Sequence, residues 1–185
     1  AGWLRLDYAG NVLTEESFAA LHTLADGRKI VTPGFYGVTP GGAVHTFSRG
    51  GSDVTGSLAA AALHADVCEN WTDVPGVLAA DPRLVPQAEP IARLTYAQLQ
   101  SLSAVGMQVL HESAVEPLRA AGIPLHIRST HQPEAPGTLI GCPDTGGGTD
   151  GAVGFAARRG IAMLRLTPLA PHTAEDVRQT VQQSG

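Results

Sequence analysis

The chain of 185 residues is long enough to bury a sizeable apolar core without disulfides or a structural metal. Its 12 basic and 17 acidic residues give a net charge of −5, which argues against a nucleic-acid or anionic-membrane partner, because both favour a basic surface. A hydrophobic content of 43% excludes wholesale disorder, and the longest run of low polarity, 57–63, is too short to cross a bilayer.

Helical and extended patterns alternate in the first part of the chain. The predicted elements are a helix capped by Thr14 that ends at Gly27, a buried strand over 29–32, a hairpin or flexible excursion over 38–47, and a helix capped by Ser52 or Asp53 that reaches His64. Glu15 and Glu16 suit the first turn of the first helix, because acidic side chains stabilise the positive end of the helix dipole.

The second part continues the alternation. The predicted elements are a strand over 65–71, a turn-rich loop over 73–86, a helix opened by the capping box Thr95-Tyr96-Ala97-Gln98, a helix with a second box of Ser113 and Glu116 that Gly122 closes, and strands over 124–129 and 138–140. Strands separated by helices imply crossover connections. The pattern therefore predicts an α/β fold with a mostly parallel sheet and helices on both faces.

The chain changes character after 141. Residues 142–151 are rich in glycine and lack apolar periodicity, which is typical of a linker. Beyond it, 161–167 is predicted to be a strand, and Thr173 and Asp176 suggest the start of a helix. One strand and one helix cannot bury their own faces, so 152–185 is expected to open an incomplete second domain.

Cysteine and histidine usage predicts no metal site. Cys68 and Cys142 are isolated and form no CxxC pair, and the seven histidines show no ligand spacing. No secretory signal is visible at the start of the chain, so we expect reduced thiols and a cytoplasmic location. Aromatic side chains such as Trp71 and Tyr96 fit apolar faces and are expected in the core.

The segment Ser48-Arg49-Gly50-Gly51-Ser52-Asp53 runs directly into a predicted helix. Consecutive glycines let backbone N–H groups approach an anion, and the helix N-terminus behind them carries a partial positive charge. The planar guanidinium of Arg49 suits a carboxylate or a phosphate. The segment is equally consistent with a glycine turn that carries an ordinary Ser/Asp cap, and it is not a Walker A loop.

A second polar segment, Trp71-Thr72-Asp73-Val74-Pro75-Gly76, lies at the carboxyl end of a predicted strand, where ligands of open α/β sheets gather. Asp73 could accept hydrogen bonds from ribose hydroxyls or help to hold a metal-bound phosphate, or it could simply begin a turn. Arg83, in Asp81-Pro82-Arg83, could reach a phosphate or remain solvated.

Several motifs follow one another in the order and spacing of aspartokinases. They are RGGSD at 49–53, WTDVPG at 71–76, DPR at 81–83, VLH at 109–111, GIP at 122–124 and GTL at 137–139. Over 30–140 the chain therefore resembles the aspartokinases, which belong to the amino-acid kinases. The resemblance implies an αβα sandwich that binds acceptor substrate in its N-terminal half and nucleotide in its C-terminal half, followed by regulatory ACT domains.

The resemblance also implies a division of the chain and a set of site residues. Residues 1–141 would be the C-terminal, nucleotide-binding part of a kinase domain, 142–151 the linker, and 152–185 the opening strand and helix of an ACT-like domain. The implied residues are Arg49 and Asp53 for catalysis, Arg49, Gly51, Ser52 and Asp53 for the acceptor, and Thr72, Asp73, Leu78, Arg83, Gln108 and Val109 for the nucleotide.

Three departures from the family pattern affect the phosphate site. Ser48 stands where many relatives have glycine, and Gln108 replaces a lysine that faces phosphate. The Lys-Phe-Gly-Gly-Thr motif that opens the family's kinase domain lies upstream of Ala1, and Lys29, the only lysine of the chain, lies on a different predicted strand. The chain alone is therefore expected to be inactive.

Together these features predict an aspartate kinase, present as a fragment, that transfers the γ-phosphoryl group of ATP, with Mg²⁺, to the side-chain carboxylate of L-aspartate. This is the first step of lysine, threonine and methionine biosynthesis. The implied partners are the N-terminal half of the kinase domain, a second copy through the ACT region, and lysine or threonine as feedback effector. The alternatives are another amino-acid kinase, acting on glutamate or acetylglutamate, and a non-catalytic module that binds nucleotide or amino acid.

Overall fold

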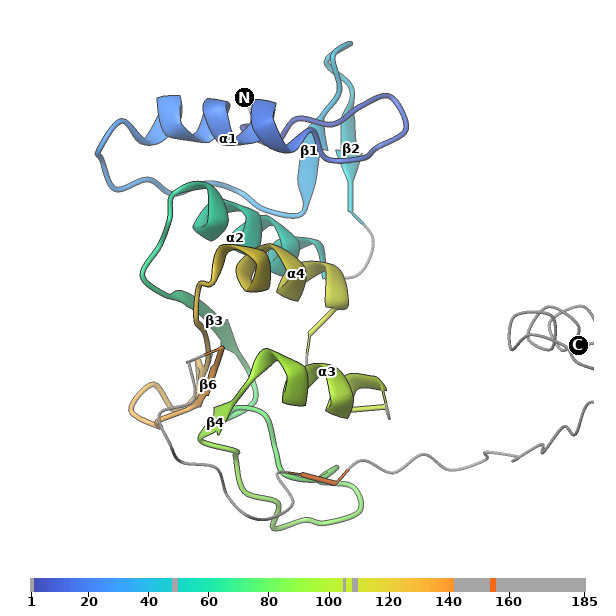
Figure 1. Cartoon of the computed structure of the whole chain (residues 1–185), viewed down its shortest axis with the longest axis vertical. Coiled ribbons are helices and arrows are strands. Elements are labelled where there is room, and N and C mark those ends of the chain that lie inside the picture. Colours follow the sequence, from blue (N-terminus) through green and yellow to red (C-terminus); the bar gives the residue numbers. More distant parts are fainter. Residues whose placement is uncertain (1, 48–49, 105, 108–109, 142–153, 156–185) are drawn as a thin grey trace, which may run out of the picture.

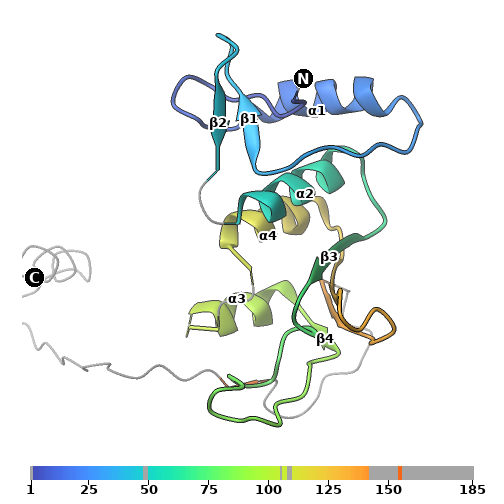
Figure 2. The same cartoon turned by 180° about the vertical axis from the view of Figure 1, so that it is seen from behind.

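Helices and strands alternate along the part of the chain that the computed structural model describes, which is residues 2–47, 50–104, 106–107, 110–141 and 154–155. In chain order they are α1 (Thr14–Ala25), β1 (Tyr36–Val38), β2 (Val44–Thr46), α2 (Gly51–Ala62), β3 (Cys68–Thr72), β4 (Arg93–Leu94), α3 (Tyr96–Ala104), α4 (Glu112–Ala121), β5 (Leu125–Ser129) and β6 (Thr138–Ile140). Figures 1 and 2 show α1 and the β1–β2 hairpin at one end, α2 and α4 in the middle, and the other strands with α3 at the far end.

Four of the strands form one sheet in the order β3-β5-β6-β4. Strands β3 and β5 run parallel, as do β4 and β6, whereas β5 and β6 are antiparallel. The single antiparallel pair follows from the short connection over 130–137, which can join neighbouring strands only as a hairpin does. The predicted α/β class with a mainly parallel sheet is confirmed.

The alternation of side chains along the strands turns one face of this sheet toward the helices. In β5, Leu125, Ile127 and Ser129 are buried, while the two residues between them are only partly covered. The buried face joins one apolar cluster whose members come from α2, α3, α4, the sheet and two connecting segments: Ala61, Val77, Leu94, Leu99, Leu118, Ile123, Leu125, Ile127 and Ile140. In a second apolar cluster, α1 packs against α2 and the N-terminal segment. Its buried members are Trp3, Leu4, Leu21, Leu58 and Ala62.

The capping box predicted at the start of α3 is confirmed. The Gln98 backbone N–H donates to Thr95 Oγ1 at 3.1 Å, and the Thr95 N–H donates to Gln98 Oε1 at 2.8 Å. This reciprocal pair satisfies two of the backbone donors that a helix N-terminus leaves free. The predicted end of α4 is also confirmed, because Gly122 lies in the left-handed region with φ +68.

The other predicted side-chain caps are wrong. Helix α1 has no side-chain cap at Thr14, and α2 begins at Gly51 behind Gly50 rather than behind Ser52 or Asp53. Glu116 does not complete a box with Ser113, because its carboxylate binds Arg119 of the same helix at 2.8 Å. At α2 a glycine turn takes the place of the side-chain cap, and in α4 the ion pair with Arg119 takes Glu116 away from it.

The strand predicted over 29–32 is also wrong. These residues pair with no strand in the described part of the chain, and Val31 is fully exposed. An apolar run becomes a strand only where its backbone N–H and C=O groups find partners. The hairpin that follows is confirmed, with β1 antiparallel to β2 and Tyr36 opposite Thr46.

The predicted linker, strand and helix after 141 lie outside the described residues, apart from Gly154 and Phe155. The Phe155 N–H donates to the Ala79 carbonyl oxygen at 2.7 Å, and Phe155 forms a parallel bridge with Ala80. Residues of the predicted second unit therefore contact the loop that follows β3.

Tyr96 links α3 to the residues just before β5 through a hydrogen bond, and this bond gives a testable effect on stability. Its hydroxyl donates to the Ile123 carbonyl oxygen at 2.6 Å, and burial raises the pKa of Tyr96 to about 12. Tyr96→Phe should lower the free energy of unfolding by about 1 kcal/mol at neutral pH, because the carbonyl loses its donor. Because the pKa of Tyr96 is higher in the folded protein than in the unfolded chain, its contribution to stability is complete below about pH 10 and is lost as the pH rises toward 12. The stability of wild type should therefore fall more steeply between these pH values than that of Tyr96→Phe, which has no group to titrate.

Urea unfolding at pH 7 to 11 measures both effects. Tyr8→Phe is the matched control. Because Tyr8 is exposed, its replacement should change neither the free energy of unfolding at pH 7 nor the pH dependence of stability. Equal stability of wild type and Tyr96→Phe at pH 7 would contradict the assigned hydrogen bond.

Candidate functional site

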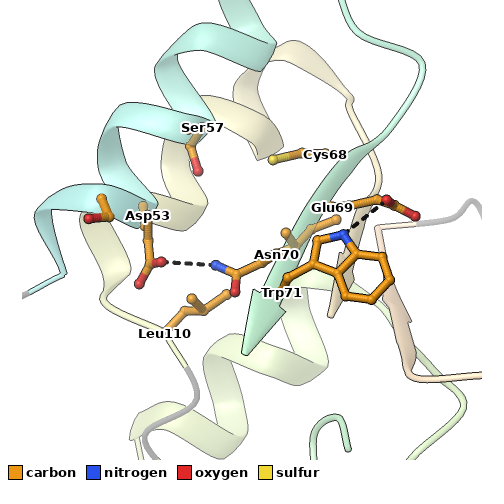
Figure 3. A pocket seen from close by; sticks show the side chains of 11 residues that line it. Asp53, Ser57, Cys68, Glu69, Asn70, Trp71 and Leu110 are labelled. Atoms are coloured by element: carbon orange, nitrogen blue, oxygen red, sulfur yellow. Dashed lines mark hydrogen bonds between the residues drawn. The ribbon is translucent and has the colours of Figure 1, made fainter. Parts of the chain in front are cut away.

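The first turn of α2 faces the end of β3 across a pocket of about 200 Å³. Figure 3 shows Asp53 and Ser57 on the α2 side and Cys68 and Asn70 on the β3 side. Its lining residues come from α2, β3, β5, and α4 with the residues before it: Ser52, Asp53, Gly56, Ser57, Cys68, Glu69, Asn70, Trp71, Leu110, Ala114 and Leu125. The pocket thus joins the two segments that the sequence singles out, RGGSD and WTDVPG.

Two glycines place the first turn of α2. Gly50 has φ +81, a left-handed conformation that glycine adopts without strain. A Cβ on Gly51 would lie 2.7 Å from Phe47 Cβ and 3.2 Å from Phe35 Cα, so only glycine lets the helix start this close to the hairpin. Gly51 therefore positions the helix, while Ser52 and Asp53, which follow it, reach the pocket wall.

Asp53 is held by a residue that the sequence analysis does not name. Asn70 Nδ2 donates to Asp53 Oδ1 at 2.9 Å, across the pocket from β3 to α2. Burial and the nearby Asp53 carboxylate raise the pKa of the Cys68 thiol, so this thiol stays protonated at neutral pH. The pocket wall therefore carries the Asp53 carboxylate, held by Asn70, beside the neutral Cys68 thiol, and a second carboxylate, Glu69, which binds Arg128 and Trp71.

The predicted nucleotide residues Thr72 and Asp73 lie at the carboxyl end of β3. Thr130, just after β5, fixes this end by donating from its backbone N–H and its Oγ1 to the Thr72 carbonyl oxygen, at 2.7 and 3.0 Å. The Thr72 hydroxyl donates to Asp73 Oδ1 at 3.2 Å, and Asp73 is exposed. The carboxyl ends of the parallel pair β3 and β5 thus meet at one edge, which is where ligands of such sheets bind.

The remaining predicted nucleotide residues are less closely grouped. Leu78 is half-buried and bridges to Pro90 in the loop after β3. Arg83 is 87% exposed and binds Asp81 at 2.7 Å, an ion pair that lowers the pKa of Asp81. Neither lines the pocket. Arg49, Gln108 and Val109 lie outside the described residues.

The outer face of β3 carries a cluster of charged and aromatic side chains. The Arg128 guanidinium lies 4.5 Å from the centre of the Trp71 ring and binds Glu69 Oε1 at 3.1 Å. Hydrogen bonds from Arg128 and Trp71 lower the pKa of Glu69. Trp71 is 43% exposed, so its predicted place in the core is wrong. The cation–π contact gives the ring a polar partner and ties β3 to β5.

Thr138 anchors the loop that carries Asp73. Its fully buried Oγ1 accepts a hydrogen bond from the Val77 N–H at 2.9 Å, a contact between residues 61 positions apart. We expect Thr138→Val, which keeps the shape, to lower the free energy of unfolding by about 1–3 kcal/mol, because the buried N–H loses its acceptor. Thermal unfolding measures the loss. Thr46→Val at an exposed strand position is the control, and equal effects of both changes would contradict this role.

No described helix is long and apolar enough to cross a membrane. Within the same residues, no group of three or more His, Cys, Asp or Glu side chains is placed to hold a metal ion.

Comparison with known proteins shows which family the chain belongs to. The model of the amino acid kinase family matches residues 3–129. Aspartokinase 3 of Bacillus subtilis is 42% identical over 143 residues, which are 76% of this chain and 31% of that protein. The aspartate kinase of Clostridium acetobutylicum superposes with a TM-score of 0.70 at 45% identity, over 76% of this chain and 32% of that one.

Aspartokinase III of E. coli, solved in complex with aspartate and ADP in the R-state, superposes with a TM-score of 0.68 at 31% identity, over 75% of this chain and 33% of that one. The chain thus spans about a third of the length of these relatives. Since the family model covers more than half of its residues, the chain belongs to the amino acid kinase family.

Proposed function

We propose that the protein containing this chain is an aspartate kinase, which transfers the γ-phosphoryl group of ATP to the side-chain carboxylate of L-aspartate. The observation that carries the proposal is the pocket between Ser52 and Asp53 of α2 and the residues of β3 from Cys68 to Trp71. That pocket lies in a chain 42% identical to an aspartokinase over 143 residues.

The reaction needs positioning and charge neutralisation rather than a covalent enzyme intermediate. An oxygen of the aspartate side chain attacks the γ-phosphorus, and the bond from that phosphorus to the bridging oxygen of ADP breaks. ADP leaves, and 4-phospho-L-aspartate forms. A general base is not required, because the attacking carboxylate is already ionised at neutral pH.

The acceptor subsite lies at the start of α2. There, Arg49 would bind the α-carboxylate of L-aspartate through its guanidinium fork, and Asp53 would accept hydrogen bonds from the ammonium group. Ser52, exposed in the first turn, offers a hydroxyl, and Gly51 holds the turn in place. A cation that binds the α-carboxylate and an anion that binds the ammonium group would together select an α-amino acid over a simple dicarboxylate.

The nucleotide subsite lies along the carboxyl end of β3. Thr72 and Asp73 would contact the nucleoside, and Leu78, Gln108 and Val109 would complete its contacts. Arg83 would reach the phosphates once it exchanges Asp81 for them, since it is exposed. Mg²⁺ usually binds through phosphates, water and one or two carboxylates, and the exposed carboxylate of Asp73 fits such a donor set. Bound with ATP, Mg²⁺ neutralises phosphate charge.

We further infer the partners of the site. An N-terminal half of the kinase domain would supply the phosphate lysine, and the joined polypeptide is called the complete protein below. The chain by itself would then be inactive. Residues 152–185 would begin a regulatory unit that pairs with a second copy and binds lysine or threonine, in the cytoplasm.

Release of ADP by the complete protein with MgATP tests the proposal. We expect release with L-aspartate, and little with L-glutamate, N-acetyl-L-glutamate or no acceptor. Faster release with one of the two glutamate substrates would assign the protein to another amino-acid kinase. Binding of MgADP without ADP release on any acceptor would identify a non-catalytic module.

A further inference from the structure

Asn70 occupies an unusual place in β3. The strand alternates Cys68, Asn70 and Thr72 toward the helices, and Glu69 and Trp71 toward the outer face. Asn70 is therefore a polar amide on the face that packs against the apolar cluster below α2 and α4. A polar group at such a position is destabilising unless it is hydrogen-bonded, and the bond that Asn70 makes is to Asp53.

The bond fixes the orientation of the Asp53 carboxylate. Asn70 Nδ2 binds Oδ1 at 2.9 Å. The other oxygen, Oδ2, lies 4.0 Å from the position of a Cβ added to Gly50, the residue between Arg49 and the helix. One oxygen is thus held by β3, and the second lies beside the glycine turn. Without the amide, the carboxylate of a helix-surface aspartate would rotate freely about its side-chain bonds.

The same strand leads from the acceptor subsite to the nucleotide subsite. Two residues after Asn70, Thr72 is held by Thr130 at the carboxyl end of β3. A rigid strand that binds Asp53 at one point and ends in Thr72 and Asp73 sets the spacing between the two substrates. Small errors in such spacing are costly, because in-line transfer needs the reacting atoms within van der Waals contact.

We propose that Asn70 is a positioning residue, which orients Asp53 toward the ammonium group of the acceptor amino acid and ties the acceptor subsite to the nucleotide strand. This inference rests on the proposed function and names a residue that acts through Asp53 rather than on substrate.

Asn70→Leu in the complete protein is the direct test, because leucine has a similar volume and no donor. We expect the KM for L-aspartate to rise about tenfold, since the hydrogen bond that orients a charged group is lost. The kcat should fall by a similar factor, because the bond also sets the spacing of the two substrates, whereas the KM for MgATP should stay within about twofold, because the nucleotide contacts at the end of β3 are kept.

Two further variants separate positioning from packing. Asn70→Gln keeps an amide donor, and the pocket has room for the longer side chain, so it should restore the KM for L-aspartate to within about threefold of wild type. Ile127→Val trims a buried side chain of β5 that lies opposite Asn70 in the sheet and does not line the pocket, and it leaves the Asn70–Asp53 bond in place. It should leave the KM for L-aspartate unchanged.

An unchanged KM for L-aspartate in folded Asn70→Leu would overturn the inference. A loss of stability that is matched by equal changes in both KM values, or that Asn70→Gln does not relieve, would also overturn it and leave Asn70 a packing residue. If Asn70→Leu does not fold, Asn70→Ala gives the same comparison. Wild type is assayed first. If it releases no ADP with L-aspartate, the proposed function itself is contradicted, whatever the variants do.

Discussion

Replacing Arg49 by lysine in the complete protein should raise the KM for L-aspartate by tens- to several hundred-fold and leave the KM for MgATP nearly unchanged. A guanidinium binds a carboxylate through two parallel N–H groups, and an ammonium cannot reproduce that geometry. The loss corresponds to about 2–4 kcal/mol of binding free energy. Steady-state kinetics with each substrate varied in turn measures both constants.

Arg28→Lys is the matched control for Arg49→Lys. Arg28 is exposed in the turn after α1, and its replacement should change neither KM. If Arg49→Lys also leaves the KM for L-aspartate unchanged, the segment from Arg49 to Asp53 is a capped glycine turn and the acceptor binds elsewhere.

Removal of the Asp53 charge should have the second largest effect. Asp53→Asn keeps the size of the side chain and an oxygen that accepts the bond from Asn70, so the packing around the pocket is preserved. The ammonium group of L-aspartate loses its anionic partner, and the KM should rise by about 10–100-fold.

Succinate, which is L-aspartate without its amino group, makes the test specific. Wild type should strongly prefer L-aspartate as phosphoryl acceptor, and Asp53→Asn should lose most of that preference. Asp66→Asn, at an exposed position between α2 and β3, should keep both the KM and the preference. A preference that survives in Asp53→Asn would show that another group reads the ammonium.

Local signals in the sequence were enough to predict most of the secondary structure. Strand β5 alternates apolar and polar residues between turn residues, β6 is a short segment with two apolar residues, and the box at Thr95 and Gln98 carries both of its side chains within four residues. The strand predicted over 29–32 depends instead on backbone partners far away in the chain, which no local pattern contains. Within the described part of the chain, 29–32 pair with no strand, and Val31 is fully exposed.

The sequence predicts only those parts of the candidate site that carry a local signal. Glycines next to Ser52 and Asp53 mark a helix start, and Asp73 follows a strand, so both segments carry local signals. Asn70 was missed because a single amide in a strand acquires meaning only from Asp53, which lies 17 residues away in sequence and is brought close by the packing of α2 on β3. The large apolar ring of Trp71 favours a core position in any local pattern, and its contact with Arg128 of the neighbouring strand cannot be seen from one strand alone.

Trapping of the product with hydroxylamine is the most direct measurement of the central claim. An acyl phosphate reacts with hydroxylamine to give a stable hydroxamate and phosphate, so the trapped product records which carboxylate was phosphorylated. The complete protein with MgATP, L-aspartate and hydroxylamine should yield the side-chain hydroxamate of aspartate, identified by mass spectrometry, in amounts that match the ADP released. Formation of ADP without any hydroxamate, or of the α-carboxyl hydroxamate alone, would contradict the account.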